Sequence, residues 1–202
     1  MLVVISYPTA VEKEVTVINA LFDEGLEVLH VRKPDTDVGD LRTLIEKIQS
    51  TYHHQIALHQ FHEIANDYGI KRLHFTEAKR KEMSEEALIQ FKPDKHTLST
   101  SIHEVEAYNI LSGCFEYAFF GPVFNSISKQ GYTSSLKKDF VFPVKNNHPK
   151  VIAIGGIDAT NIQQAMHMQF SGAALLGAIW QKPGESIQQF KAVQKACKQT
   201  GR

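Results

Sequence analysis

Val151-Ile152-Ala153-Ile154-Gly155-Gly156-Ile157 is an apolar run that ends in two glycines, and Gly172-Ala173-Ala174-Leu175-Leu176-Gly177-Ala178-Ile179 repeats that arrangement. Neither run alternates with polar residues, which is typical of a strand buried on both faces. Glycine lets backbone N–H groups approach a ligand closely, and a helix N-terminus that follows adds partial positive charge. Two such turns near the end of a chain are typical of the phosphate site of a (β/α)8 barrel.

The rest of the chain alternates strand patterns with helical patterns. The strand-like runs are Leu2–Ser6, Val28–Arg32, Gln55–Leu58, Arg72–Phe75, Thr97–Ser101, Tyr117–Phe120, Val151–Ile154 and Ala173–Leu176. The helical patterns are Val11–Asp23, Asp40–Ser50, Phe61–Tyr68, Met83–Phe91, Glu104–Leu111, Thr160–Met168 and Ser186–Cys197. This alternation predicts an α/β fold with a parallel sheet, a (β/α)8 TIM barrel, with a doubly wound open sheet as the alternative. No linker divides the chain, so we expect a single domain over residues 1–202.

Composition narrows the class of function. The 22 Lys and Arg residues balance the 22 Asp and Glu residues, which argues against coating nucleic acid or an anionic membrane. No apolar run approaches the roughly 20 residues of a membrane span, and the first residues lack the features of a signal peptide. The two cysteines, Cys114 and Cys197, form no motif. We therefore expect a cytoplasmic protein that acts on small molecules, with a homodimer as the default assembly.

Active-site residues of a barrel follow the C-terminal ends of its strands. Arg32 and Lys33 follow the second strand, and histidines and hydroxyl side chains follow the next three. This set lacks a nucleophile–base pair but suits phosphate binding, with Arg as a bidentate fork and Lys as a point charge. Adjacent strand residues face opposite sides, so we expect Arg32 to face the barrel axis and leave the direction of Lys33 open.

About thirty residues with little helical pattern separate the sixth and seventh strands. They contain Pro122, Gly131, Pro143 and Pro149. Long loops in compact domains are usually functional or disordered, and this one follows a strand end. We expect an active-site lid that carries Ser126, Ser128 and Lys129, rather than a surface excursion.

Five segments together resemble the thiamine phosphate synthase and TenI family of (β/α)8 barrels. The resemblance extends in order over nearly the whole chain, and the last two segments are the most specific. The segments are His30-Val31-Arg32-Lys33, Leu73-His74-Phe75, Ser101-Ile102-His103 with Glu106, Gly121-Pro122-Val123-Phe124-Asn125-Ser126-Ile127-Ser128-Lys129, and Ala153-Ile154-Gly155-Gly156-Ile157 with Asn161.

The resemblance implies a transferase that joins hydroxymethylpyrimidine pyrophosphate to thiazole phosphate and releases pyrophosphate. In such enzymes a C–O bond breaks first, and the thiazole nitrogen captures the pyrimidine cation. The family implies Mg²⁺ and cations at the departing pyrophosphate. The expected catalytic residues are Arg32, Lys33 and Lys129, and the expected substrate-binding and phosphate-binding residues are His30, Ser101, Ser126, Ser128, Lys129, Gly155, Gly156, Gly177 and Ala178.

The chain also departs from the family pattern where the metal would bind. The family's Asn-Asp-Arg after the third strand is replaced by His59-Gln60-Phe61, and a second family Asp aligns near Lys79. Mg²⁺ prefers hard oxygen ligands, commonly one or two carboxylates. Glu77 is the nearby carboxylate that we expect to substitute as a metal ligand.

Two alternatives to the transferase stay open. TenI-type members isomerise a thiazole carboxylate phosphate with a histidine after the sixth strand, where this chain has Pro122. His59, His74 or His103 would then supply a proton shuttle, because imidazole titrates near neutrality. The other alternative is a non-catalytic protein that binds thiazole phosphate or thiamine phosphate.

The remaining histidines and aromatic residues have plainer interpretations. The ten histidines show no recognised zinc spacing, so structural or solvent-facing roles are favoured over a metal site. Phe115, Tyr117, Phe119 and Phe120 are expected to pack the barrel, and Trp180 to pack a helix. The run Lys79-Arg80-Lys81 is expected to be a solvated loop.

Overall fold

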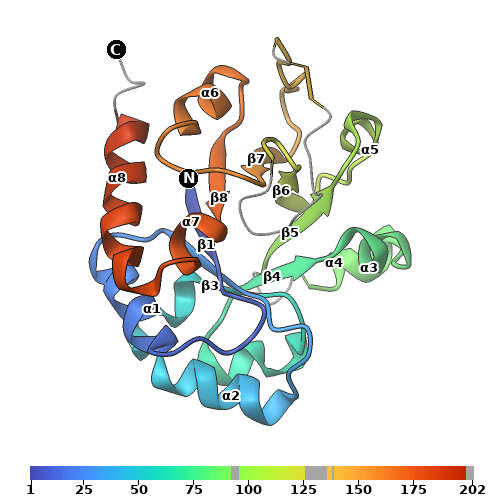
Figure 1. The fold of residues 1–202 in the computed structure, drawn as a ribbon. Coiled ribbons are helices and arrows are strands. Elements are labelled where there is room, and N and C mark those ends of the chain that lie inside the picture. Colours follow the sequence, from blue (N-terminus) through green and yellow to red (C-terminus); the bar gives the residue numbers. More distant parts are fainter. Residues whose placement is uncertain (92–95, 126–135, 138, 199–202) are drawn as a thin grey trace.

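Eight parallel strands close into a barrel in the computed structural model, which describes residues 1–91, 96–125, 136–137 and 139–198 (Figure 1). The strand order follows the sequence, and β1 pairs with β8 through Val3 and Ala174. The strands are β1 (Leu2–Ile5), β2 (Val28–Val31), β3 (Ile56–Leu58), β4 (Arg72–Phe75), β5 (Thr97–Ile102), β6 (Phe115–Phe120), β7 (Lys150–Ile154) and β8 (Gly172–Leu175). The prediction of a TIM barrel is confirmed.

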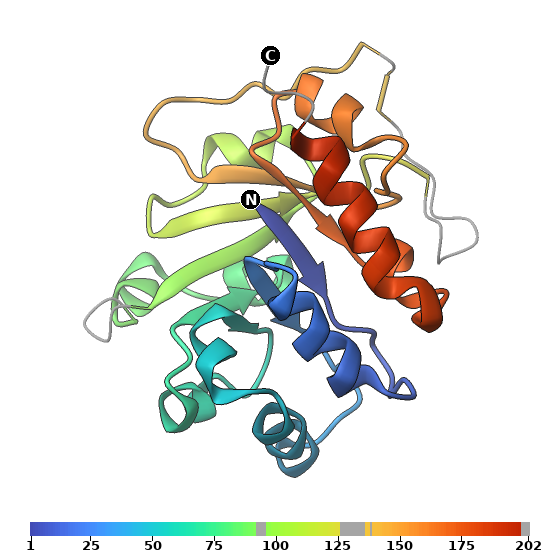
Figure 2. The ribbon, with the colours of Figure 1, turned by 90° about the vertical axis from the view of Figure 1, so that its left-hand side faces the viewer.

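The helices lie outside the strands (Figures 1 and 2). The α-helices are α1 (Glu14–Asp23), α2 (Val38–Lys47), α3 (Glu77–Lys81), α4 (Glu85–Ile89), α5 (Val105–Asn109), α6 (Ile162–His167), α7 (Gly177–Trp180) and α8 (Ser186–Lys198). Three segments are 3-10 helices: η1 (Ser50–Gln55), η2 (His62–Tyr68) and η3 (Pro183–Glu185). Helix α8 packs against α1, α6 and α7. Among the helices of the described residues, none is long and apolar enough to cross a bilayer.

Side-chain alternation along the strands divides the buried residues into two groups. One face of each strand packs against the helices, through residues such as Leu29, Leu58 and Val151. The other face fills the barrel interior, where the apolar members are Val3, Ile5, Val28, Ala57, Tyr117, Phe119, Ile152 and Ala174. Among the described residues, the interior also holds the buried polar side chains of His30, His74 and Ser99. The interior is therefore unusually polar around β2, β4 and β5.

Two helical segments differ from the sequence prediction. The Phe61–Tyr68 pattern forms the 3-10 helix η2, which ends at Gly69 in the left-handed conformation. The run Lys79-Arg80-Lys81 was predicted to be a solvated loop and instead forms the end of α3. The Thr76 hydroxyl accepts a hydrogen bond from the Lys79 backbone N–H and caps this helix. The cap satisfies a free N–H, and cations are favourable near a helix C-terminus, so the charged run is compatible with a helix.

Candidate active site

A cavity of about 450 Å³ opens at the C-terminal ends of the strands. This is the end of a barrel where active sites are built. Its lining includes Ile5, Tyr7, Thr9, Arg32, His59, His74, Thr76, Ser101, His103, Phe119, Gly121, Pro122, Ile154, Gly155, Gly156, Leu176 and Gly177. Five of the residues expected at the substrate site thus share one cavity, namely Arg32, Ser101, Gly155, Gly156 and Gly177.

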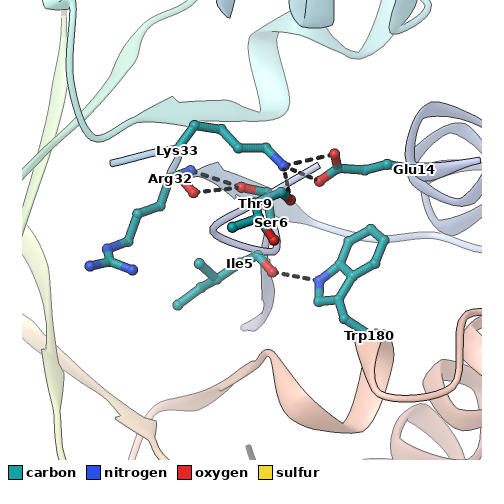
Figure 3. Close-up of polar contacts among 7 residues, drawn as sticks. All are labelled: Ile5, Ser6, Thr9, Glu14, Arg32, Lys33 and Trp180. Atoms are coloured by element: carbon teal, nitrogen blue, oxygen red, sulfur yellow. Dashed lines mark hydrogen bonds and ion pairs between the residues drawn. The ribbon is translucent and has the colours of Figure 1, made fainter. Parts of the chain in front are cut away.

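Arg32 and Lys33 leave the end of β2 in opposite directions (Figure 3). The Arg32 backbone is held by Ser6, whose Oγ accepts from Arg32 N at 2.9 Å, and its side chain lines the cavity. Lys33 Nζ donates to both carboxylate oxygens of Glu14 at 2.7 Å and to Thr9 O at 2.9 Å. The expectation that Lys33 holds pyrophosphate beside Arg32 is therefore corrected: its ammonium lies in a buried ion pair outside the cavity.

The Gly155–Gly156 turn brings the backbone to the cavity wall. Both residues have positive φ, 99° and 65°. A Cβ on Gly155 would lie 2.8 Å from Pro122 Cα, and a Cβ on Gly156 would overlap the carbonyl of Asn125. Asn161 Nδ2 donates to Gly156 O at 2.8 Å and fixes the turn. These positions need glycine for conformation and for space.

The second glycine turn, after β8, is joined to the first strand. Gly177 begins α7 and lines the cavity, whereas Ala178 is half-buried and lies outside the lining. Trp180 is buried, and its indole N–H donates to Ile5 O at 2.7 Å (Figure 3). The predicted packing role of Trp180 is confirmed, and it holds the β8–α7 turn against β1.

Three histidines meet at the base of the cavity. His30 Nδ1 lies 2.9 Å from His59 Nε2, and His30 Nε2 lies 2.6 Å from the Tyr117 hydroxyl. The His59 and His74 rings stack with centroids 4.0 Å apart. Strand alternation explains the cluster, because His30, Ala57 and His74 all face inward and His59 follows Ala57 by two residues. His30 was expected to touch substrate, but it lies fully buried beneath the cavity and outside its lining.

Burial keeps these histidines neutral. Desolvation lowers the pKa of His74 to about 3, and it also lowers the pKa values of His30 and His59 well below their usual range. Desolvation raises the pKa of Tyr117 to about 12. An uncharged imidazole carries one N–H donor and one acceptor nitrogen. The cluster is therefore an uncharged hydrogen-bonding array at neutral pH.

The donor groups around the cavity do not fit Mg²⁺. The described residues of the lining include no Asp or Glu. Glu77, the expected substitute, lies outside the lining on α3, with Oε1 2.9 Å from Lys81 Nζ and 3.7 Å from Arg80. Its Oε2 lies 3.8 Å from Nε2 of His103, which lines the cavity. Mg²⁺ is usually held by carboxylates and phosphates, and both carboxylate oxygens of Glu77 lie beside basic side chains, so Glu77 is corrected to an ion-pair residue at the edge of the cavity.

The histidine cluster does not fit a metal either, although one nitrogen from each ring lies within 4.8 Å of the others. The His59 and His74 planes differ by only 24° in their stack, so their in-plane lone pairs do not converge on one point. Both nitrogens of His30 and of His74 already have hydrogen-bond partners. This geometry therefore offers no convergent set of free nitrogen lone pairs among these three rings.

The structure does not describe three of the expected site residues, and some residues that line the cavity were not predicted from the sequence. Ser126, Ser128 and Lys129 lie outside the described residues. Tyr7 and Thr9, which were not predicted, line the cavity after β1. Their positions directly after strands were the available signal, but their residue types are common in loops.

Comparison with known proteins decides the family. The family model described as thiamine monophosphate synthase matches residues 1–179. The chain belongs to the thiamine monophosphate synthase family. This membership supports a thiamine phosphate synthase-like function. A search of curated proteins finds no match.

Three solved structures with a similar fold cover nearly the whole chain. A thiamine phosphate pyrophosphorylase from Bacteroides thetaiotaomicron is 24% identical, with a TM-score of 0.75, covering 100% of this chain and 99% of that one. Another from Pyrococcus furiosus is 15% identical, with a TM-score of 0.79 and coverages of 100% and 96%. A 3-hexulose-6-phosphate synthase is 10% identical, with a TM-score of 0.67 and coverages of 97% and 99%. At these identities the likeness shows the fold alone.

Proposed function

We propose that the protein is a transferase of the thiamine phosphate synthase type. It joins hydroxymethylpyrimidine pyrophosphate to thiazole phosphate and releases pyrophosphate. The supporting observation is that the Arg32 side chain, the Gly155–Gly156 turn and Gly177 line one cavity at the C-terminal end of the barrel. Such a cavity, mostly apolar with a few polar groups, is typical of a site for a small phosphorylated ring.

Each part of the proposed reaction has a place in this cavity. The glycine turns accept the thiazole phosphate, because their backbones approach closely and a helix begins at Gly177. Phe119, Pro122 and Ile154 provide apolar walls for the rings. The pyrimidine C–O bond breaks, and its electron pair leaves with the pyrophosphate, whose charge Arg32 stabilises by bidentate hydrogen bonds. The thiazole nitrogen lone pair then forms the new C–N bond to the pyrimidine cation.

A second candidate function is isomerisation of a thiazole carboxylate phosphate. The observation that favours it is the pair of neutral imidazoles, His59 and His74, at the cavity wall. A neutral imidazole has one N–H donor and one acceptor nitrogen, so it can accept a proton on one nitrogen and release one from the other without becoming charged. The same glycine turns would hold the single phosphate of this substrate.

A direct assay separates these functions. Purified protein receives hydroxymethylpyrimidine pyrophosphate and thiazole phosphate, with and without Mg²⁺, and thiamine phosphate is measured. Glu77→Gln runs in parallel and is expected to respond to Mg²⁺ as the wild type does, because Glu77 is paired with Lys81. Formation of thiamine phosphate supports the transferase. Binding of thiazole phosphate without product contradicts it, and thiazole carboxylate phosphate then tests for the isomerase against simple binding.

A further inference from the structure

A path of hydrogen-bonding side chains crosses the barrel interior and returns to the cavity. On one arm His59 Nε2 contacts His30 Nδ1 at 2.9 Å, and His30 Nε2 contacts the Tyr117 hydroxyl at 2.6 Å. On the other arm Ser99 Oγ contacts His74 Nδ1 at 3.0 Å, and His74 Nε2 contacts Ser101 Oγ at 3.1 Å. His59 and Ser101 both line the cavity.

Tyr117 and Ser99 join the two arms. They are paired neighbours on β6 and β5, and both are buried. The Tyr117 hydroxyl also has a hydrogen-bonding interaction with the side chain of Ser99, and with that of Arg72 from β4. Ser99 Oγ also donates to Leu73 O at 3.4 Å, so the Ser99 hydroxyl must rotate from Leu73 toward His74 for the path to run from one side of the cavity to the other.

We propose that His59, His30, Tyr117, Ser99, His74 and Ser101 form a proton wire with both ends at the ligand. The wire moves a proton from one atom of a bound ligand to another atom of the same ligand. Its use in catalysis rests on the isomerase function proposed above, whereas its existence in the free protein does not.

The transfers balance at every atom. A ligand X–H bond breaks, and His59 Nδ1 takes the proton while its Nε2–H passes to His30 Nδ1. The His30 Nε2–H passes to Tyr117, and the Tyr117 proton passes through Ser99 to His74 Nδ1. The His74 Nε2–H passes to Ser101, whose own hydroxyl proton forms the new bond to the ligand. Each group gives one proton and takes one, so no group on the wire is left charged. Exchange with solvent at the two ends restores the starting direction.

The barrel interior favours this concerted route over a charged intermediate. An ionised side chain without compensation is costly in a low-dielectric interior, and His30, His74, Ser99 and Tyr117 are all buried. Burial lowers the pKa values of all three histidines and raises the pKa of Tyr117. A relay of neutral groups avoids both imidazolium and phenolate.

The first test uses the protein without ligand. Nitrogen-15 NMR of the histidine rings reports which nitrogen carries the proton. In the wild type, proton movement along the wire interconverts the two tautomers of His59, so its two ring nitrogens show nitrogen-15 chemical shifts averaged between the protonated and unprotonated values. Tyr117→Phe leaves His30 Nε2 without a partner, and a bare acceptor nitrogen is better tolerated in the interior than an unpaired N–H. His30 then donates from Nδ1, and His59 becomes fixed with its proton on Nδ1.

The matched control is Tyr108→Phe, at an equally buried tyrosine whose hydroxyl accepts from Lys145 N outside the barrel interior. It should leave the His59 shifts at their wild-type values. Ser99→Ala interrupts the wire at a second point and should also move them. The proposal is overturned if Tyr117→Phe and Ser99→Ala both leave His59 as Tyr108→Phe does.

The second test measures isomerisation of thiazole carboxylate phosphate. Tyr117→Phe should lower kcat by about 100-fold or more, the lower range for proton transfer catalysis, with KM within about twofold of the wild type because Tyr117 lies outside the cavity lining. An equal loss in Tyr108→Phe, or a loss confined to KM, counts against the wire. If the wild type shows no isomerisation but the NMR coupling is present, the wire stands and the isomerase function fails.

Discussion

Lys33 and Glu14 form an ion pair in which Lys33 Nζ donates to both carboxylate oxygens of Glu14 at 2.7 Å. Both side chains are about 8% exposed, and the pair joins the end of β2 to the first turn of α1. Burial raises the pKa of Glu14, although the Lys33 ammonium opposes that shift. The pair fixes the end of β2, the same segment from which Arg32 enters the cavity.

Removing Lys33 should destabilise the protein. Lys33→Met leaves the buried Glu14 carboxylate without its partner, and breaking a buried pair in this way costs about 3–5 kcal/mol. Urea denaturation measures the free energy of unfolding. Lys191→Met is the matched control, because Lys191 pairs with Glu24 at 2.8 Å on the surface and exposed pairs contribute about 0–1 kcal/mol. Equal stabilities of the two variants would contradict the structural role of Lys33.

Arg32 should contribute directly to anion affinity. Arg32→Gln removes a charged hydrogen-bond donor worth about 1.5–3 kcal/mol, so the Kd for inorganic pyrophosphate should rise about 10- to 100-fold. Isothermal titration calorimetry measures this change. Arg42→Gln is the control, since Arg42 lies on α2 and pairs with Asp67. An unchanged Kd in Arg32→Gln would remove Arg32 from the proposed anion site.

Gly156 should tolerate alanine less well than Gly69 does. The two glycines have nearly the same φ, 65° and 67°, so the conformational cost of a Cβ is similar, about 1–2 kcal/mol. A Cβ on Gly69 meets no atom within 4 Å, whereas one on Gly156 overlaps the Asn125 carbonyl. The difference in Tm between Gly156→Ala and Gly69→Ala therefore measures the cost of the steric overlap between a Cβ at residue 156 and the Asn125 carbonyl. Equal Tm values would show that the β6–β7 segment moves away without cost.

The buried histidines should make the fold sensitive to acid. An unfolded histidine binds a proton near pH 6.5, but His74 in the fold does so only near pH 3. Between these pH values the unfolded state binds more protons than the folded state does. The contribution of the neutral His74 ring to the free energy of unfolding is therefore fully present above pH 6.5 and is lost as the pH falls toward 3. One such ring lowers the free energy of unfolding by about 1.4 kcal/mol per pH unit.

Urea titrations at several pH values measure this slope. His74→Gln removes one titrating ring and should flatten the slope between pH 6.5 and 4. His54→Gln, at an exposed histidine of η1, is the matched control. The same slope in both variants would rule out His74 as a source of the acid sensitivity.

The sequence predicted the features that depend on the backbone. Unbroken apolar runs such as Val151–Ile154 indicate strands buried on both faces. Eight strand patterns alternating with helical patterns predicted a barrel, with an open sheet as the alternative. Gly155, Gly156 and Gly177 were predictable for the same reason, because glycine marks the places where the chain must turn or approach closely. All three lie at the cavity.

The features that depend on side-chain direction were harder to predict. Alternation ends where a strand ends, so nothing near Lys33 showed that its ammonium would turn toward Glu14, nineteen residues earlier. His30, His59 and His74 come from three different strands, and barrel closure brings their rings together. Their spacing along the chain matches no zinc motif, although His59 and His74 were predicted as alternative proton shuttles.

The bond from Trp180 to Ile5 has a consequence for synthesis on the ribosome. The cavity takes Ile5 and Tyr7 from the beginning of the chain and Gly177 from near its end, and β1 gains its second neighbour only when β8 is present. A nascent chain that does not yet include residues 172–180 therefore lacks one wall of the cavity, even if its earlier strands have paired. Ligand binding therefore requires the closed barrel, and a bound ligand stabilises the closed barrel over any chain in which β8 is not yet paired.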